Sequence, residues 1–340
     1  MTNDSFCFQP SGSEPTRVLR SEEKFKRSSN SVARSLVCFA VSPYIPATLK
    51  TITIIQSSDV AENAFNGFAN VQKIVVGSMS TIGKNAFKNN TTIKDVVISD
   101  GVTGINHSAF NGCSNLNNVL LGKNITEIKE YAFNSCSSLT SITIPSSVTR
   151  IDGYAFNGCT SLSDIIIKNR TEELLLASNG LSGLFSSCPL DSVYIGGKIT
   201  YNTQSNAGYS PFYNNKSLRT VVITDNETEI YDYEFYNCSN LNKITIGNGV
   251  KKIGNYAFCG CMGLEHFEFG QNVESIGEKA FSDCDNITSL ISAAIVPPIC
   301  ASQALEDINK WNCVLYVPEE SLSSYQAADQ WKDFFFFEKL

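Results

Sequence analysis

The stretch IKEYAFNSCSSLTSITIPSSV, residues 128–148, contains the pattern that decides the fold. Phe133 is followed by Cys136, by Leu139 and then by Ile142 and Ile144. Two isoleucines separated by a single residue have the period of a β-strand, so both are expected to face inward. The stretch therefore predicts a turn around the phenylalanine that leads into a half-buried strand.

The same pattern recurs along the chain, and its phenylalanines stand mostly 23 residues apart. They are Phe65, Phe87, Phe110, Phe133, Phe156, Phe212, Phe235, Phe258 and Phe281. A second apolar pair, Val148 and Ile151 in this copy, predicts another inward-facing turn that closes each coil. A single coil cannot bury all of these apolar residues, but stacked coils form a continuous core. The period therefore predicts an α/β repeat, a solenoid of about ten coils with one parallel strand per coil.

Three segments are expected. Residues 1–45 lack the pattern and are predicted to be an irregular N-terminal segment. Residues 46–292 form the array, in which the coils over 165–221 are longer than the others. In residues 293–340, Pro297 and Pro298 interrupt the period, and this segment is predicted to form a C-terminal cap.

The cap is expected to contain a strand at residues 314–317 and a short helix after Pro318. Leu322, Tyr325 and Trp331 would then cover the last coil, because an open coil end exposes the core and unpaired strand edges.

Three strings make the pattern specific: IDGYAFNGCTSLSDIII at residues 151–167, IKEYAFNSCSSLTSITIPSSV at 128–148 and IGNYAFCGCMGLEHFEF at 253–269. They resemble the BspA-like leucine-rich-repeat family of bacterial surface proteins over roughly residues 46–292. The ending, residues 296–334, also resembles the tail that closes such arrays. The resemblance implies a leucine-rich-repeat solenoid that is displayed on the cell surface or outside the cell and serves adhesion.

No intact signal peptide is recognised, because the apolar run at residues 36–41 is short and far from Met1. The composition, 42% hydrophobic and 17% charged, is typical of a folded chain and includes no apolar run long enough to span a bilayer. The net charge of -7 opposes binding to phosphate backbones, so no nucleic-acid partner is expected.

Seven of the twelve cysteines occupy one repeat position: Cys113, Cys136, Cys159, Cys188, Cys238, Cys261 and Cys284. They are predicted to be buried free thiols, because side chains stacked at one coil position run parallel to one another. A ribbon of metal-binding thiolates is the alternative, but no CxxC pair supports it. Cys300 and Cys313 lie outside this ladder, and whether they form a disulfide stays open.

No motif predicts catalysis or a cofactor. There is no HExxH and no phosphate-binding glycine loop, and the chain has only two histidines. A carbohydrate-active enzyme on a parallel solenoid is the alternative, with Glu227, Glu229, Asp232 and Glu234 as candidate carboxylates. These four are expected to be solvated turn residues. The prediction is therefore a binding protein without catalytic residues, cofactor or metal.

The outward strand position between the two inward residues forms a partly apolar column. Its candidate binding residues are Val97, Leu120, Ile166 and Tyr194. A polar column beside it gives the arrangement of a protein-contact surface, although β-propensity alone also places Val and Ile on strands.

The enlarged coils provide a second candidate region, with Tyr194, Tyr201, Asn202, Tyr209 and Tyr213. Tyrosine and asparagine are typical of adaptable recognition loops. The alternative is that these tyrosines pack over a wider coil.

The sequence thus favours a surface-displayed adhesion module that recognises a host or microbial protein or glycan through its strand face and tyrosine-rich loops. A carbohydrate-active enzyme and an intracellular protein-interaction scaffold are the alternatives. Neither the ligand nor the oligomeric state follows from the sequence.

Overall fold

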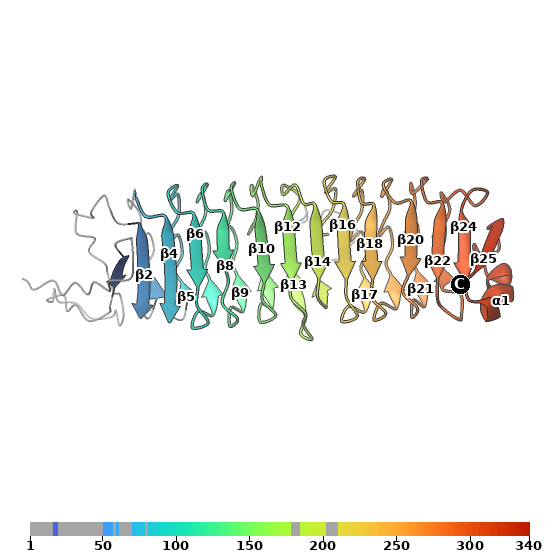
Figure 1. The fold of residues 1–340 in the computed structure, drawn as a ribbon, viewed down its shortest axis with the longest axis horizontal. Coiled ribbons are helices and arrows are strands. Elements are labelled where there is room, and N and C mark those ends of the chain that lie inside the picture. Colours follow the sequence, from blue (N-terminus) through green and yellow to red (C-terminus); the bar gives the residue numbers. More distant parts are fainter. Residues whose placement is uncertain are drawn as a thin grey trace, which may run out of the picture. The chain divides into compact units, whose positions relative to one another are not determined.

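A computed structural model describes residues 16–19, 50–56, 59–60, 70–78, 81–177, 184–201 and 210–340. The chain divides into two compact units, Met1–Leu162 and Ser163–Leu340. Both units are built from coils, each with one longer and one shorter strand (Figure 1). The predicted solenoid of parallel strands is confirmed, with about 11 turns.

The longer strands of the first unit pair in parallel in the order β1-β2-β4-β6-β8. They are β1 (Thr16–Leu19), β2 (Thr51–Gln56), β4 (Lys73–Ser78), β6 (Asp95–Ile98) and β8 (Asn118–Leu120), and β10 (Ser141–Ile144) follows outside this ladder. The shorter strands pair in a second ladder: β3 (Asp59–Val60), β5 (Thr81–Ile82), β7 (Gly104–Ile105), β9 (Glu127–Ile128) and β11 (Arg150–Ile151). β1 lies within the segment that the sequence suggested to be irregular.

The longer strands of the second unit form two parallel ladders (Figure 1). The first contains β12 (Asp164–Ile167), β14 (Ser192–Ile195), β16 (Thr220–Ile223) and β18 (Lys243–Ile246), and the second contains β20 (His266–Phe269), β22 (Ser289–Ser292), β24 (Val314–Val317) and β25 (Phe336–Lys339). The shorter strands are β13 (Leu174–Leu176), β15 (Ile199–Thr200), β17 (Glu229–Ile230), β19 (Lys252–Ile253), β21 (Ser275–Ile276) and β23 (Ile299–Cys300).

Helix is almost absent from the described residues. The 3-10 turn η2 (Glu319–Ser321) leads into α1 (Leu322–Ala327), a helix at the place expected after Pro318. The α part of the expected α/β class is therefore limited to this short segment, because each coil returns through turns and a two- or three-residue strand. No described helix is long and apolar enough to cross a membrane.

Stacked phenylalanines run through the core of each unit. In the first unit, the ring centroids of Phe87, Phe110, Phe133 and Phe156 follow one another at 5.0, 5.3 and 5.5 Å. In the second unit, Phe212 stacks on Phe185 at 5.7 Å and on Phe235 at 5.5 Å. All these rings are buried, so the repeated phenylalanine is the central packing residue of each coil.

The residue two positions after each repeated phenylalanine is a glycine or a small polar residue, because the backbone is left-handed there. Its φ is positive at Asn89, Gly112, Ser135, Gly158, Asn214, Asn237, Gly260 and Asp283. Glycine adopts this conformation without strain, and asparagine and aspartate tolerate it better than most residues. The turn that reverses each coil is therefore encoded in the sequence.

The last coils contain the residues that were expected to close the array. Tyr325 and Trp331 are fully buried, and the Trp331 ring meets Phe269 edge to face at 5.6 Å. The Trp331 Nε1–H donates to the carbonyl of Pro298 over 2.8 Å. These contacts tie the chain after Pro318 to the preceding coils of the same unit.

Candidate functional site

The outward strand positions carry the residues predicted for ligand contact. In β6 the inward Val96 and Ile98 are buried, whereas Val97 is half-buried. In β8, Leu120 is 63% exposed, and in β12, Ile166 is 43% exposed. On the longer strands from β6 to β24, Leu120 and Ile166 are therefore the most accessible apolar side chains.

The ladder of longer strands in the first unit ends at β8, and β10 begins another. The residue after a longer strand normally donates its N–H to the preceding coil, as Ser99 does to the carbonyl of Val76 over 2.8 Å. Pro145 occupies this position after β10 and has no N–H to donate, so the junction between β8 and β10 lacks a ladder bond.

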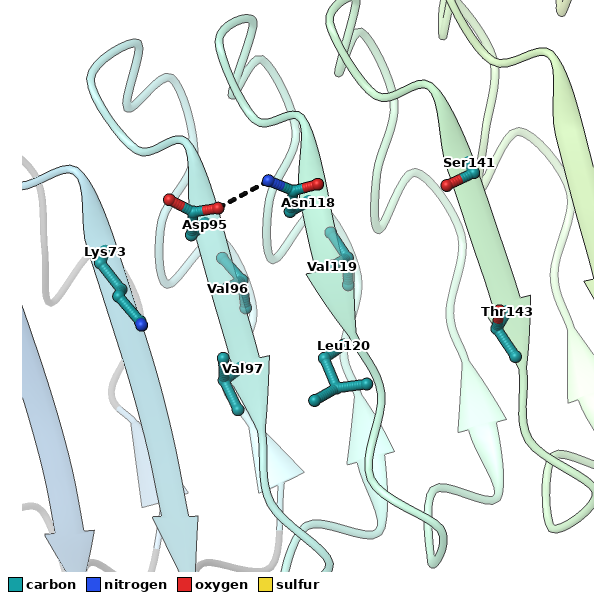
Figure 2. Close-up of a pocket in the computed structure, with 9 residues that line it drawn as sticks. All are labelled: Lys73, Asp95, Val96, Val97, Asn118, Val119, Leu120, Ser141 and Thr143. Carbon is teal, nitrogen blue, oxygen red and sulfur yellow. Dashed lines mark hydrogen bonds between the residues drawn. The ribbon is translucent and has the colours of Figure 1, made fainter.

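A hollow of about 310 Å³ lies over this junction (Figure 2). Its lining residues are Lys73, Asp95, Val96, Val97, Asn118, Val119, Leu120, Ser141 and Thr143. Val119 occupies an inward register position opposite the buried Val96, but it is only half-buried. Beside the interrupted ladder, the inward Val119 is therefore more accessible than its neighbour Val96 in the same ladder.

Polar groups border the apolar floor of this hollow. The Asn118 Nδ2 donates to Asp95 Oδ1 over 2.7 Å, from one strand to the next (Figure 2). Lys73 on β4 and Ser141 on β10 lie on either side of this pair in the polar column. The site therefore combines an exposed leucine with an oriented amide and carboxylate, an arrangement suited to binding a ligand with both apolar and polar groups.

Sequence reasoning identified Val97 and Leu120 but not the hollow between β8 and β10. Pro145, directly after the predicted strand, shows only that one ladder donor is missing there, which does not by itself predict the hollow. Four of the polar lining residues occupy the column predicted to border the apolar stripe: Lys73, Asp95, Asn118 and Ser141.

The candidates of the second unit form a smaller group. Ile166 and Tyr194 are register neighbours on β12 and β14. The Tyr194 hydroxyl donates to Asn169 Oδ1 over 2.8 Å, which holds the half-buried ring against the strand face. Tyr213 is half-buried and stacks on Tyr236 at 5.6 Å rather than on Tyr194.

Tyr201 is a packing residue, so its assignment to a ligand-contacting loop is wrong. Its side chain is 6% exposed, and its hydroxyl donates to the carbonyl of Asp232 over 2.9 Å. The ring also meets Tyr231 edge to face at 5.7 Å. The widened coil buries this tyrosine, as the packing alternative required. Asn202 and Tyr209 lie outside the described residues.

Two of the four candidate carboxylates are buried, contrary to the expectation that all are solvated. Glu227 and Glu234 are each 2% exposed. Glu227 Oε2 accepts the N–H of Ile199 over 2.9 Å, and Glu234 Oε2 accepts the N–H of Tyr231 over 2.8 Å. The repeat register contained the signal, because Glu227 stands where Val250 stands in another copy, and Glu234 stands where alanine precedes phenylalanine.

Burial raises the pKa of both glutamates. For Glu227 the backbone hydrogen bonds oppose this effect, whereas for Glu234 the nearby Glu227 charge adds to it and raises the pKa well above the usual value. Of the two others, Glu229 pairs with Lys252, and the carboxylate of Asp232 accepts the N–H of Asn255 over 2.7 Å. Both of these carboxylates are thus engaged in contacts with the following coil.

The cysteine ladder is confirmed as a set of buried free thiols. In the regular coils, each thiol of the ladder donates to the carbonyl of a phenylalanine one coil earlier, as Cys113 does to Phe87 over 3.1 Å. Cys300 and Cys313 are also free thiols in the structure. Among the described residues, no three His, Cys, Asp or Glu side chains are grouped so as to hold a metal ion.

The sequence matches the model of the BspA type leucine rich repeat region in six copies, over residues 46–105, 80–210 and 205–294. The chain therefore belongs to the BspA type leucine-rich-repeat family. The resemblance carried by the three repeat strings, which was expected over roughly residues 46–292, is confirmed. No curated protein matches the sequence.

Solved structures with a similar fold include other leucine-rich-repeat proteins. A leucine-rich repeat protein from Bacteroides ovatus is 19% identical, with a TM-score of 0.35, over 86% of this chain and 92% of that one. A leucine rich cell surface protein from Faecalibacterium prausnitzii is 18% identical, with a TM-score of 0.32, over 100% and 94%. An internalin from Listeria monocytogenes is 14% identical, with a TM-score of 0.43, over 83% and 80%.

Proposed function

We propose that this chain is a surface-displayed adhesion protein whose ligand docks on the hollow over the junction of β8 and β10. The observation that carries the proposal is the exposed Leu120 beside the interrupted ladder. An apolar side chain that is 63% exposed, next to the Asp95–Asn118 pair, has the anatomy of a contact surface with an apolar centre and a polar rim.

Membership of the BspA type family supports binding rather than catalysis. The ligand is a host or microbial protein or glycan, and the family supports its encounter at the cell surface. Ile166, Tyr194 and Tyr213 are proposed as further contacts on the second unit, together with Asn202 and Tyr209 of the enlarged coils.

The buried positions of Glu227 and Glu234 weigh against the carbohydrate-active alternative. A glycosidase needs two carboxyl groups that flank a bond of the bound sugar. Side chains that are each 2% exposed and accept backbone N–H groups are not presented to a substrate.

A binding screen tests the proposal. Wild-type chain, Leu120→Asp and Thr245→Asp are applied to the same arrays of glycans and extracellular matrix proteins. Thr245 is an exposed outward residue on β18 and serves as the matched control. We expect Leu120→Asp to weaken binding at least about 10-fold, since it places a charge at the centre of the contact, and Thr245→Asp to leave it unchanged. Equal loss in both variants would contradict a site on β8.

A further inference from the structure

Four half-buried tyrosines form a continuous surface on three successive coils of the second unit. They lie in the turns around the repeated phenylalanine and are called the tyrosine patch: Tyr213, Tyr233, Tyr236 and Tyr256. The Tyr236 ring stacks on Tyr213, with centroids 5.6 Å apart, and meets Tyr233 at 5.7 Å. Tyr233 in turn stacks on Tyr256 at 5.1 Å. The four rings therefore form one aromatic surface that lies outside the strands.

The fold does not require aromatic rings at two of these positions. Tyr233 and Tyr256 each stand two residues before a repeated phenylalanine, where φ is positive, at 60° and 55°. A left-handed backbone is strained for a bulky residue and is better tolerated by asparagine. Asn85 occupies the same repeat position with a φ of 56°. The coil therefore folds without a tyrosine there, and its backbone preference does not explain the two rings.

Two carboxylates lie beside Tyr233 and Tyr256. The Tyr256 hydroxyl donates to Oε1 of the exposed Glu278 over 3.4 Å. Burial raises the pKa of Tyr233, and the negative charges of Asp232 and Glu278 raise it further. Both carboxylates are therefore close enough to act electrostatically on the rings of the tyrosine patch.

A third carboxylate, the exposed Asp283, acts on Tyr236. Burial raises the pKa of Tyr236, and the charge of Asp283 adds to this effect. Among the described residues, no salt bridge involves Asp283 or either of the other two carboxylates. Lys279, the basic residue that follows Tyr256 at the same repeat position, offsets only one of the three charges. The tyrosine patch therefore has an excess of negative charge at its rim.

The first unit contains a smaller tyrosine stack in a different electrostatic setting. Tyr131 and Tyr154 occupy the same repeat position, also with positive φ, and their centroids are 5.1 Å apart. The carboxylate beside them, Glu130, already lies 3.9 Å from Nε2 of His107. This pair therefore repeats the aromatic geometry without the acidic excess, and it is a matched control for the tyrosine patch.

We propose that the tyrosine patch binds an arginine-rich segment of another protein. A guanidinium group is planar and stacks on tyrosine rings, and its donors also match the geometry of a carboxylate. The tyrosine patch offers both kinds of partner. A neutral sugar would use the rings but not the charges, whereas carboxylates spread over several coils suit a segment with several cations. The patch shares no residue with the hollow over β8 and β10, so it is a second binding surface beyond the proposed adhesion site.

Hexa-arginine is the probe that tests the proposal, by isothermal titration calorimetry at about 150 mM salt, which screens long-range attraction to the acidic chain. Hexacitrulline has a similar shape without the charge, and we expect it not to bind. Tyr233→Asn combined with Tyr256→Asn removes two rings and suits the left-handed backbone, so the dissociation constant for hexa-arginine should rise at least about 5-fold. Tyr256→Phe keeps the ring and should change it by less than about 2-fold.

Matched controls separate the tyrosine patch from the charge of the whole chain. Glu278→Gln should weaken hexa-arginine binding about 3-fold, whereas Glu268→Gln removes the same charge from an exposed residue of β20 and should leave it unchanged. Tyr131→Asn combined with Tyr154→Asn should also leave it unchanged. Thermal unfolding shows that each variant is folded, and Glu278→Gln alters only an exposed side chain. The proposal is overturned by no binding up to about 1 mM peptide, by equally tight binding of hexacitrulline or choline, or by equal losses in the two tyrosine pairs.

Discussion

The Cys136 thiol donates to the carbonyl oxygen of Phe110, one coil earlier, over 3.2 Å. Cys159 and Phe133 repeat this bond at 3.2 Å, and so do Cys261 and Phe235. The repeated cysteine is therefore a core residue that satisfies a backbone carbonyl at the turn of the neighbouring coil. A small apolar side chain fills the space, and its weak donor completes the hydrogen bonding.

Burial makes these thiols poor nucleophiles. It raises the pKa of Cys113 and of Cys159 to about 12, so neither is ionised near neutral pH, and the thiolate is the reactive form. We expect iodoacetamide to label both residues much more slowly in native than in unfolded protein, as measured by peptide-resolved mass spectrometry. Similar rates in the two states would show that the cysteine position does not face the core.

Phe133→Ala should destabilise the chain by about 3 to 5 kcal/mol, because it removes a buried ring and leaves a cavity. The ring stacks on Phe110 and Phe156, so the loss affects two neighbouring coils. Denaturant unfolding measures the change, with Leu120→Ala as the control. Because Leu120 is exposed, Leu120→Ala should lower the free energy of unfolding by less than about 1 kcal/mol. Equal losses in the two variants would contradict the assigned register.

Glu234→Gln should stabilise the chain at neutral pH. The pKa of Glu234 is raised in the folded state, so folding disfavours the charged form. Wild-type stability is therefore highest below the unfolded pKa and falls as pH rises toward the folded value. The glutamine variant lacks this loss, so the two stability curves should converge below pH 4.5, the ordinary pKa of a glutamate, and separate above it. Parallel curves across this range would contradict a buried carboxyl group.

Tyr201→Phe should destabilise the chain by about 1 kcal/mol, because it removes the hydrogen bond to the Asp232 carbonyl and leaves that acceptor unsatisfied. Tyr201→Ala should lose several times more, since it also removes the buried ring. Thermal unfolding of the two variants measures the difference. An alanine variant as stable as wild type would show that Tyr201 is not a buried packing residue.

The repeat positions made most of the fold predictable. Phe133, Leu139, Ile142 and Ile144 recur at fixed spacing, and each is buried where the pattern required it. Short-range periodicity is sufficient in a solenoid, because every coil packs mainly on its neighbours. The return path of each coil was less predictable, since two-residue strands such as β11 leave little signal in the sequence.

The candidate site was only partly predictable, because its shape depends on contacts between coils. Val97 and Leu120 follow from the alternation of strand residues, but the hollow also depends on where the ladder of longer strands is interrupted. Tyr201 was misassigned for a related reason. The composition of the surrounding sequence is typical of a recognition loop, whereas the burial of Tyr201 depends on how the widened coil packs against Tyr231 and Asp232.

The central claim is that a ligand covers Leu120, and protection of a cysteine placed there tests it most directly. Leu120→Cys and the control Thr245→Cys are labelled with iodoacetamide, with and without a glycan or matrix protein that the wild-type chain captures. Peptide-resolved mass spectrometry reads each site separately from the native thiols. The account predicts that the ligand slows labelling at position 120 at least about 10-fold and leaves position 245 unchanged. Equal labelling at position 120 with and without bound ligand would contradict it.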